Sequence, residues 1–167
     1  ELYLLSKAWP ASYEDLEAAL VRSLKALGTG YLDAYLLHWP GTDRNRRLRA
    51  YEQGIRLRER GLIRSLGVSN FLTEQLQDIH EIFGEFPVIN ELELHPSYRQ
   101  QKLTGFCRAH AIQPIAYQPI NRGQYAGNRV LTQIAAAHGK TLAQVILRWH
   151  LQMGFVPIPK SSHAERI

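Results

Sequence analysis

The fold of this chain is decided by residues 32–40, LDAYLLHWP, which form a predicted strand with a histidine at its end and a Trp-Pro turn behind it. The strand is largely apolar on both faces, which is typical of a parallel sheet that is covered on both sides. Residues 2–7, LYLLSK, form a second predicted strand that ends in Lys7. Because a β/α barrel carries its chemistry at the carboxyl ends of its strands, Lys7 and His38 are expected to meet over one reacting atom.

Strand-like and helix-like segments alternate along the rest of the chain. Further strands are predicted at 63–69, 88–94, 113–117 and 155–159. The spacing of apolar residues predicts helices at 13–27, 48–60, 73–83, 99–110, 130–138 and 142–154, with a loop at 120–128 and a last helix from Ala164. Ser12 and Thr141 are the expected N-caps of two of these helices. Six strands separated by helices predict an α/β protein, either a doubly wound open sheet or a barrel.

Two observations favour the barrel. No GxGxxG follows the first strand, so the dinucleotide fingerprint of the open sheet is missing. Polar residues stand instead at or near every predicted strand end: Lys7, His38, Ser69-Asn70, Asn90-Glu91, Tyr117-Gln118 and Lys160-Ser161. An open sheet gathers its site at one crevice, whereas a barrel gathers it from all strand ends. We therefore expect one domain, residues 1–167, with the architecture of a TIM-type β/α barrel.

Composition excludes several classes of protein. Hydrophobic residues make up 45% and charged residues 21% of the 167 residues, which is ordinary for a globular domain. No run of about 18 apolar residues predicts a membrane span, and the first residues do not resemble a signal peptide. The one cysteine, Cys107, is expected to be a buried small residue and suits a reducing cytoplasm. No metal site is expected, because the sequence has no HxxxH, cysteine pair or carboxylate cluster at ligand spacing.

The net charge of +5 favours an anionic partner, such as a nucleic acid or a phosphorylated cofactor. The densest basic run, residues 44–49, is interpreted as solvated surface, since such runs are usually exposed. No stacking motif or helix-turn-helix accompanies it, so nucleic acid is not the expected partner. His95 precedes Pro96 and is expected to close a turn.

Each candidate residue has a chemical and a structural interpretation. Lys7 and His38 could polarise a carbonyl oxygen, or be a surface lysine and a core histidine. Ser69 and Asn70 could bind a carboxamide, or belong to an ordinary turn. Glu91 could add an acceptor and Tyr117 a stacking face, or both could serve packing. A last cluster could bind an anion at a helix start, or be a basic surface: Lys160, Ser161, Ser162, His163 and Arg166.

Taken together, five segments resemble the aldo-keto reductases. They are LSKAW at 5–9, LDAYLLHWP at 32–40, GLIRSLGVSNF at 61–71, NELELHP at 90–96 and IPKS at 158–161. Residues 137–141 and 148–152 are most similar to the bacterial 2,5-diketo-D-gluconate reductase branch of that family. The resemblance implies a (β/α)8 barrel that reduces aldehydes and ketones with NADPH.

The resemblance also implies roles for individual residues. Lys7 and His38 would be catalytic, and Trp9 and Trp39 would face the substrate. Ser69, Asn70 and Glu91 would hold the nicotinamide, and Tyr117 would stack on its ring. Glu91 stands where the family has a glutamine. The adenosine 2′-phosphate side would be bound by Lys160, Ser161, Ser162 and Arg166.

The six strands resemble the third to eighth strands of the family, and the family's catalytic tyrosine and aspartate precede the lysine strand. We therefore expect an incomplete barrel of six β/α units without the first two strands, truncated at both ends. The full-length protein is expected to be a cytoplasmic, monomeric carbonyl reductase. The alternative is a catalytically incompetent NADP(H)-binding unit.

Overall fold

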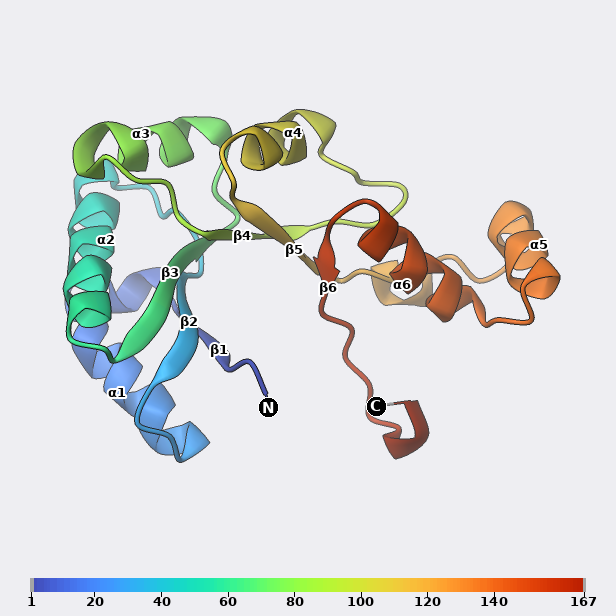
Figure 1. Ribbon diagram of the computed structural model, residues 1–167, viewed down its shortest axis with the longest axis horizontal. Helices are drawn as coiled ribbons and strands as arrows, with labels where there is room; N and C mark the ends of the chain where they lie inside the picture. Colours follow the sequence, from blue (N-terminus) through green and yellow to red (C-terminus); the bar gives the residue numbers. More distant parts are fainter. Residues whose placement is uncertain (1, 167) are drawn as a thin grey trace.

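The computed structural model describes residues 2–166 and contains one curved sheet of parallel strands (Figure 1). Each strand pairs in parallel with the next one along the chain. This sequential order is that of a β/α barrel, whereas the order reverses in a doubly wound open sheet. The α/β prediction is confirmed. The strands are β1 (Leu5–Ala8), β2 (Leu32–Leu37), β3 (Ile63–Ser69), β4 (Ile89–Glu93), β5 (Gln113–Tyr117) and β6 (Val156–Pro157).

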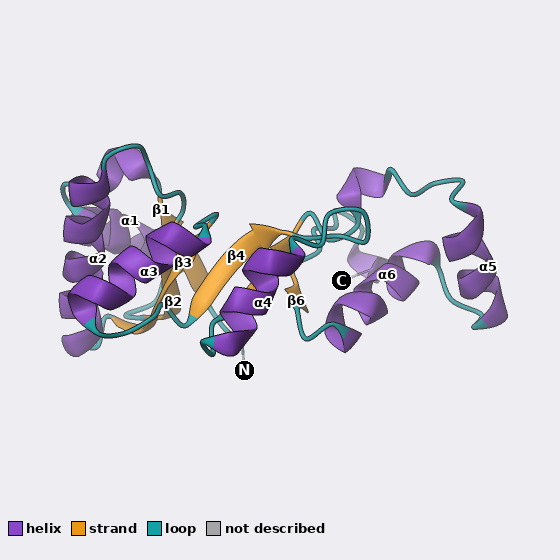
Figure 2. Cartoon of the chain, turned by 90° about the horizontal axis from the view of Figure 1, so that it is seen from above, coloured by secondary structure: helices purple, strands orange, loops and turns teal. Residues whose placement is uncertain are grey.

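Helices α1 to α4 follow the outer side of the sheet, whereas α5 lies far from it, beyond α6 (Figures 1 and 2). The described residues also form three short 3-10 turns. They are η1 (Pro10–Ser12) between β1 and α1, η2 (Asn121–Gly123) within the predicted loop, and η3 (Ala164–Arg166), where a last helix was expected to begin. The helices are α1 (Leu16–Leu27), α2 (Arg44–Glu59), α3 (Thr73–Phe83), α4 (Gln101–Ala109), α5 (Arg129–Ala137) and α6 (Leu142–Gln152).

Local hydrogen bonds decide where the helices begin. The N-cap predicted at Ser12 is wrong: the side chain of Asp15 accepts from the Ala18 N–H, so α1 begins at Leu16. The cap predicted at Thr141 is confirmed, since its hydroxyl accepts from the Gln144 N–H.

The basic run at 44–49 forms the first turns of α2, which begins four residues earlier than expected because the Asp43 side chain caps it. The interpretation of this run as solvated surface is wrong for Arg47, which is 6% exposed. Its guanidinium donates to the Pro40 carbonyl at 3.1 Å and to Asp78 at 3.3 Å. Two further arginines of the run are paired with carboxylates, Arg44 with Asp78 and Arg46 with Glu14.

The two outer strands are shorter than predicted. β1 begins at Leu5, which pairs with Ala34, while the Leu4 N–H donates to the carboxylate of Asp33 instead. β6 has two residues, because only Val156 and Pro157 lie in register with β5.

The sheet has a large core on its outer side, beneath the helices, and a small one on its inner side. The inner core consists of Ala34, Leu36, Ile89 and Ile115, with Leu5 packed against it. The strand register aligns Lys7 with Leu36 and Gly67, and Ser69 with Glu91 and Ile115. Parallel partners at the same level point to the same face, so these polar side chains lie on the inner face beside the small core.

Gly67 is required where the inner side chains of β2 and β4 approach β3. A Cβ at this position would lie against Leu36 Cδ2, 3.0 Å from Ile89 Cβ and 3.2 Å from the Ile89 carbonyl oxygen. We expect Gly67→Ala to lower the free energy of unfolding by about 1–3 kcal/mol through overpacking, measured by urea titration. Gly105→Ala on α4 is the matched control, because its Cβ meets no atom within 4 Å and adds helix propensity. Equal stability of the two variants would contradict this account.

Candidate functional site

The carboxyl ends of five consecutive strands bring polar side chains together at one rim of the sheet. Lys7 lies in β1, His38 directly follows β2, Ser69 ends β3, Glu91 lies in β4 and Tyr117 ends β5. The expected meeting of the strand ends is therefore observed for these five residues. We call this set the rim site.

An ion pair crosses the rim site. Lys7 Nζ lies 2.5 Å from Glu91 Oε1, although the two residues are separated by strands β2 and β3. The side chain of Glu91 is 3% exposed and that of Lys7 is 24% exposed. The second carboxylate oxygen, Glu91 Oε2, is buried without a hydrogen-bond partner. The ion pair thus leaves one buried acceptor and the remaining N–H donors of Lys7 for a bound molecule.

His38 lies near this ion pair and packs against Trp9. Partial burial lowers the pKa of His38 below its ordinary value, the Lys7 ammonium lowers it further, and Glu91 acts in the opposite direction. The imidazole is therefore neutral at pH 7 and carries one N–H that can donate to an oxygen. Its ring meets the edge of Trp9 at a centroid distance of 4.8 Å.

Trp9 and Trp39 flank the rim site and are 55% and 42% exposed. The main chain of Trp39 is held by a hydrogen bond, because the buried Tyr13 hydroxyl donates to its carbonyl oxygen at 2.5 Å. Burial raises the pKa of Tyr13, so this hydroxyl stays protonated and keeps donating. The exposed Trp9 ring therefore gives the rim site an apolar border beside His38.

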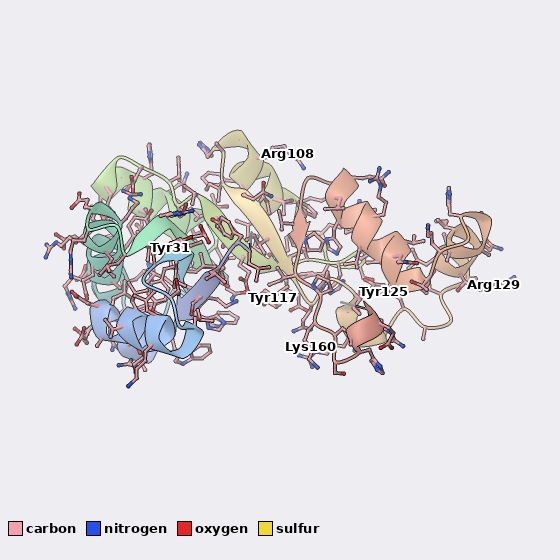
Figure 3. The ribbon with its side chains drawn as sticks, turned by 60° about the horizontal axis from the view of Figure 1, so that its bottom comes forward. Tyr31, Arg108, Tyr117, Tyr125, Arg129 and Lys160 are labelled. Atoms are coloured by element: carbon pink, nitrogen blue, oxygen red, sulfur yellow. The ribbon has the colours of Figure 1, made fainter. Side chains whose placement is uncertain are left out.

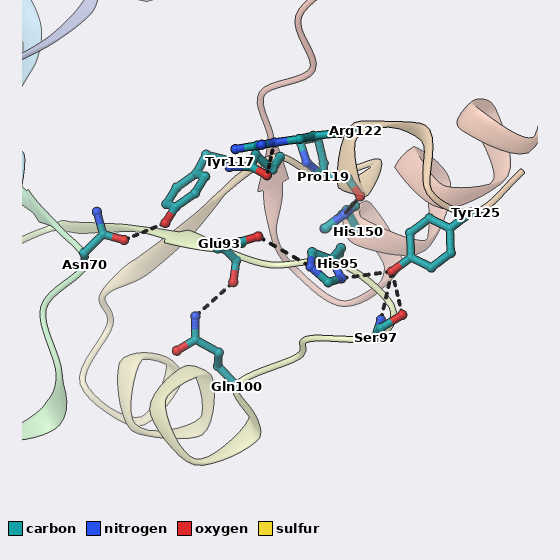
Figure 4. A network of polar contacts seen from close by, with 11 residues as sticks. Asn70, Glu93, His95, Ser97, Gln100, Tyr117, Pro119, Arg122, Tyr125 and His150 are labelled. Carbon is teal, nitrogen blue, oxygen red and sulfur yellow. Dashed lines mark hydrogen bonds and ion pairs between the residues drawn. The ribbon is translucent and has the colours of Figure 1, made fainter.

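Ser69, Asn70 and Tyr117 form a hydrogen-bonded chain at the ends of β3 and β5. Asn70 has a left-handed backbone, with φ of 61°, which asparagine tolerates better than most residues. Its amide donates to the His38 carbonyl at 3.2 Å and to Ser69 Oγ at 3.0 Å, and the Tyr117 hydroxyl donates to Asn70 Oδ1 at 2.9 Å (Figure 4). Ser69 Oγ itself donates to the Glu91 carbonyl at 3.0 Å. Both amide donors of Asn70 are used in these hydrogen bonds, whereas Asn70 Oδ1 keeps one unused lone pair.

The predicted anion cluster lies apart from these contacts. Lys160, Ser161, Ser162 and Arg166 belong to the tail that follows β6, on which Figure 3 labels Lys160. Within the tail, Ser161 Oγ accepts from the His163 N–H at 3.0 Å and Arg166 Nε lies 3.9 Å from Glu165. Over residues 2–166 no hydrogen bond joins these four side chains to the rim site.

Sequence analysis missed a second polar cluster, centred on the Tyr125 hydroxyl. His95 does close a turn, as predicted, through hydrogen bonds with Tyr98. Its Nδ1 also lies 2.9 Å from the Tyr125 hydroxyl, which accepts from the Ser97 N–H at 3.0 Å (Figure 4). Tyr125 lies in the loop between β5 and α5, where no periodic pattern predicts burial, so the sequence carries no signal for this contact. The cluster anchors that loop to the segment after β4.

A cavity of about 730 Å³ lies away from the rim site, between α5, α6 and Pro96. Its lining includes Leu131, Ile134, Val145 and Trp149 and none of the rim residues. This cavity is a gap between helices beside the loop anchored by Tyr125, and no strand end opens into it.

In residues 2–166 no three His, Cys, Asp or Glu side chains gather as metal ligands would. None of the helices in that part of the chain has the length and apolar character of a membrane span.

A sequentially ordered parallel sheet with a lysine and a histidine at adjacent strand ends defines a site of the β/α-barrel enzyme type. The profile of the Aldo/keto reductase family matches residues 5–167, and the chain belongs to this family. Glyoxal reductase of Bacillus subtilis is 44% identical over 170 residues, covering 100% of this chain and 60% of that protein. Methylglyoxal reductase DkgA of Escherichia coli is 38% identical over 169 residues, with 100% and 62% covered. The chain thus spans about three fifths of these relatives.

Solved structures agree with the fold. An aldo/keto reductase from Brucella melitensis superposes with a TM-score of 0.94 at 39% identity, covering 99% of this chain and 64% of that one. A mutant of Gox0644 crystallised in complex with NADPH gives a TM-score of 0.95 at 34% identity, with 99% and 62% covered.

The charge of Lys7 is expected to control the protonation of His38. We expect Lys7→Met to raise the pKa of His38, because the ammonium opposes a second positive charge and the unpaired Glu91 then favours one. An NMR titration of the His38 ring protons measures this shift. Lys25→Met on α1 is the control and leaves the titration of His38 unchanged. A pKa that stays the same or falls in Lys7→Met would contradict the described arrangement.

The Tyr125 hydroxyl is expected to stabilise the fold. Tyr125→Phe leaves the Ser97 N–H without its acceptor, so we expect the free energy of unfolding to fall by about 1–3 kcal/mol in urea titration. Tyr98→Phe removes a hydroxyl from a tyrosine that is 50% exposed and is expected to change stability by less than about 0.5 kcal/mol. A loss in Tyr125→Phe as small as that expected for Tyr98→Phe would show that the Tyr125 contacts do not stabilise the fold.

Proposed function

We propose that this chain provides the cofactor and carbonyl site of an NADPH-dependent reductase that converts small aldehydes and ketones to alcohols. The observation that carries the proposal is the rim site, in which Lys7 and His38 lie at adjacent strand ends beside Ser69, Asn70 and Tyr117. The NADPH complex of Gox0644 and the reductases named above support it.

The free acceptors of the rim site fit the carboxamide of a nicotinamide. A carboxamide NH₂ presents two donors, and Glu91 Oε2 and Asn70 Oδ1 each have an unused lone pair. The Tyr117 hydroxyl is held by Asn70, which fixes the aromatic ring where it can stack on a planar group. We assign Ser69 an indirect role, because its hydroxyl is fully buried and holds Asn70 and Glu91 in place.

We assign the chemistry of the rim site to Lys7 and His38. NADPH, when bound, supplies a hydride to the carbonyl carbon. The neutral His38 donates a hydrogen bond to the carbonyl oxygen, and a remaining N–H of Lys7 donates to the same oxygen as negative charge develops there. Trp9 and Trp39 exclude water from one side of the substrate. The alkoxide oxygen then takes a proton, which we assign to the tyrosine that precedes the lysine strand in this family.

We assign the 2′-phosphate of the cofactor to Lys160, Ser161, Ser162 and Arg166. This exposed segment places two cations and two hydroxyls within seven residues. Phosphate groups are recognised by such charge-assisted hydrogen bonds.

A second function, NADP(H) binding without turnover, is favoured by the surroundings of Lys7. Over residues 2–166 its ammonium bonds only to Glu91, and no tyrosine hydroxyl reaches it. The Tyr3 and Tyr13 hydroxyls donate to main-chain oxygens of Asp33 and Trp39 instead.

We also propose a cytoplasmic monomer that does not bind nucleic acid. The residues assigned above all come from one chain, and the single cysteine, Cys107, is buried. Pairing of Arg44, Arg46 and Arg47 with carboxylates removes the basic surface that a nucleic acid would need.

Cofactor binding and turnover are expected to separate in one variant. We expect Lys7→Met to bind NADPH within about threefold of the unmodified protein but to lose about 10²–10⁴-fold in kcat with methylglyoxal, because the lysine acts on the reacting oxygen. NADPH fluorescence titration and NADPH oxidation at 340 nm measure the two properties. Binding without carbonyl-dependent oxidation in the unmodified protein would establish the second function. Absence of NADPH binding would contradict both.

A further inference from the structure

The ion pair between Lys7 and Glu91 changes the charge that a substrate meets at the rim site. A lone ammonium beside His38 would present a net positive charge to the reacting group. Here Glu91 Oε1 lies 2.5 Å from Lys7 Nζ, and the carboxylate is almost completely buried. An acidic group held this close cancels the charge of the lysine within a small volume.

Stability alone does not explain why this ion pair is buried. Removing two charges from water costs more than their attraction returns unless the remaining polar atoms are also satisfied. That condition is not met, because Glu91 Oε2 has no hydrogen-bond partner. A buried ion pair that leaves one carboxylate oxygen of the rim site unsatisfied indicates a role toward a bound molecule.

The charges that face the rim site come from β1 and β4. Lys7 and Glu91 both act on His38, in opposite directions, and Glu91 and Glu93 both act on Tyr117. His38 is neutral at pH 7, so these groups sum to one positive and two negative charges. Ser69, which ends β3, and Asn70, which follows it, add none.

We propose that Glu91 is a specificity-determining residue, whose carboxylate neutralises Lys7 so that the rim site selects uncharged carbonyl compounds over carbonyl compounds that carry a carboxylate next to the reacting carbon. This inference rests on the proposed reductase function. Glu91 excludes 2-oxo acids in two ways. It balances the charge of the ammonium that would attract their carboxylate, and its own oxygens can only accept hydrogen bonds, so they repel a second carboxylate.

The first test needs no turnover. Sodium acetate is titrated into the protein at constant ionic strength while the NMR signals of the His38 ring are followed. We expect Glu91→Gln, which keeps the shape of the side chain and frees the ammonium, to bind acetate at least tenfold more tightly than the unmodified protein. Glu93→Gln removes a charge from the same strand without freeing Lys7 and is expected to show no gain. The double variant Lys7→Met/Glu91→Gln is expected to lose the gain again.

The second test compares the kcat/KM values of methylglyoxal and glyoxylate. We expect Glu91→Gln to shift their ratio at least tenfold toward the anionic glyoxylate, with circular dichroism confirming that the variant is folded. Equal acetate affinity in the unmodified protein and Glu91→Gln would overturn the proposal, as would a gain that persists in the double variant. If no carbonyl compound is reduced by any variant, the reductase function fails, and the acetate titration still decides whether Glu91 masks Lys7.

Discussion

The register of the parallel sheet is the constraint on which the rest of the structure depends. Residues at one level of neighbouring parallel strands point to one face, and a slip of one residue would turn each side chain to the other face. The observed register places Lys7, Ser69 and Glu91 on the inner face together with the apolar side chains of the small core. Packing of Leu36 and Ile89 against Gly67 therefore fixes the same alignment that assembles the rim site.

Much of this arrangement could be predicted from the sequence, because it follows from strand periodicity. Apolar runs ending in Lys7, His38 and Ser69 indicate parallel strands, and parallel strands share one carboxyl edge. The ion pair could not be predicted, since it joins residues 84 positions apart and depends on how strongly the sheet curves. Glu91 was identified as a candidate, but its contact with Lys7 is a property of the folded sheet.

The errors also have physical causes. Arg47 looked solvated because it belongs to a basic run, yet a cap at Asp43 starts the helix earlier and turns this arginine toward Pro40 and Asp78. Tyr125 lies in a loop, where no periodic pattern distinguishes a buried side chain from an exposed one. In both places a few tertiary hydrogen bonds decide burial, and sequence patterns describe segments rather than individual contacts.

The reach of Lys7 across the sheet depends on the small residues of β3. Lys7 is level with Gly67, whereas Glu91 is level with Ser69, so the lysine side chain must pass over β3 to meet the carboxylate. Large inner side chains at these two positions would fill that path. Gly67 leaves room for Leu36 and Ile89, and the fully buried Ser69 hydroxyl fixes the main chain of Glu91. The small size of Gly67 and Ser69 therefore lets the inner core pack, and it also allows Lys7 on β1 to reach Glu91 on β4.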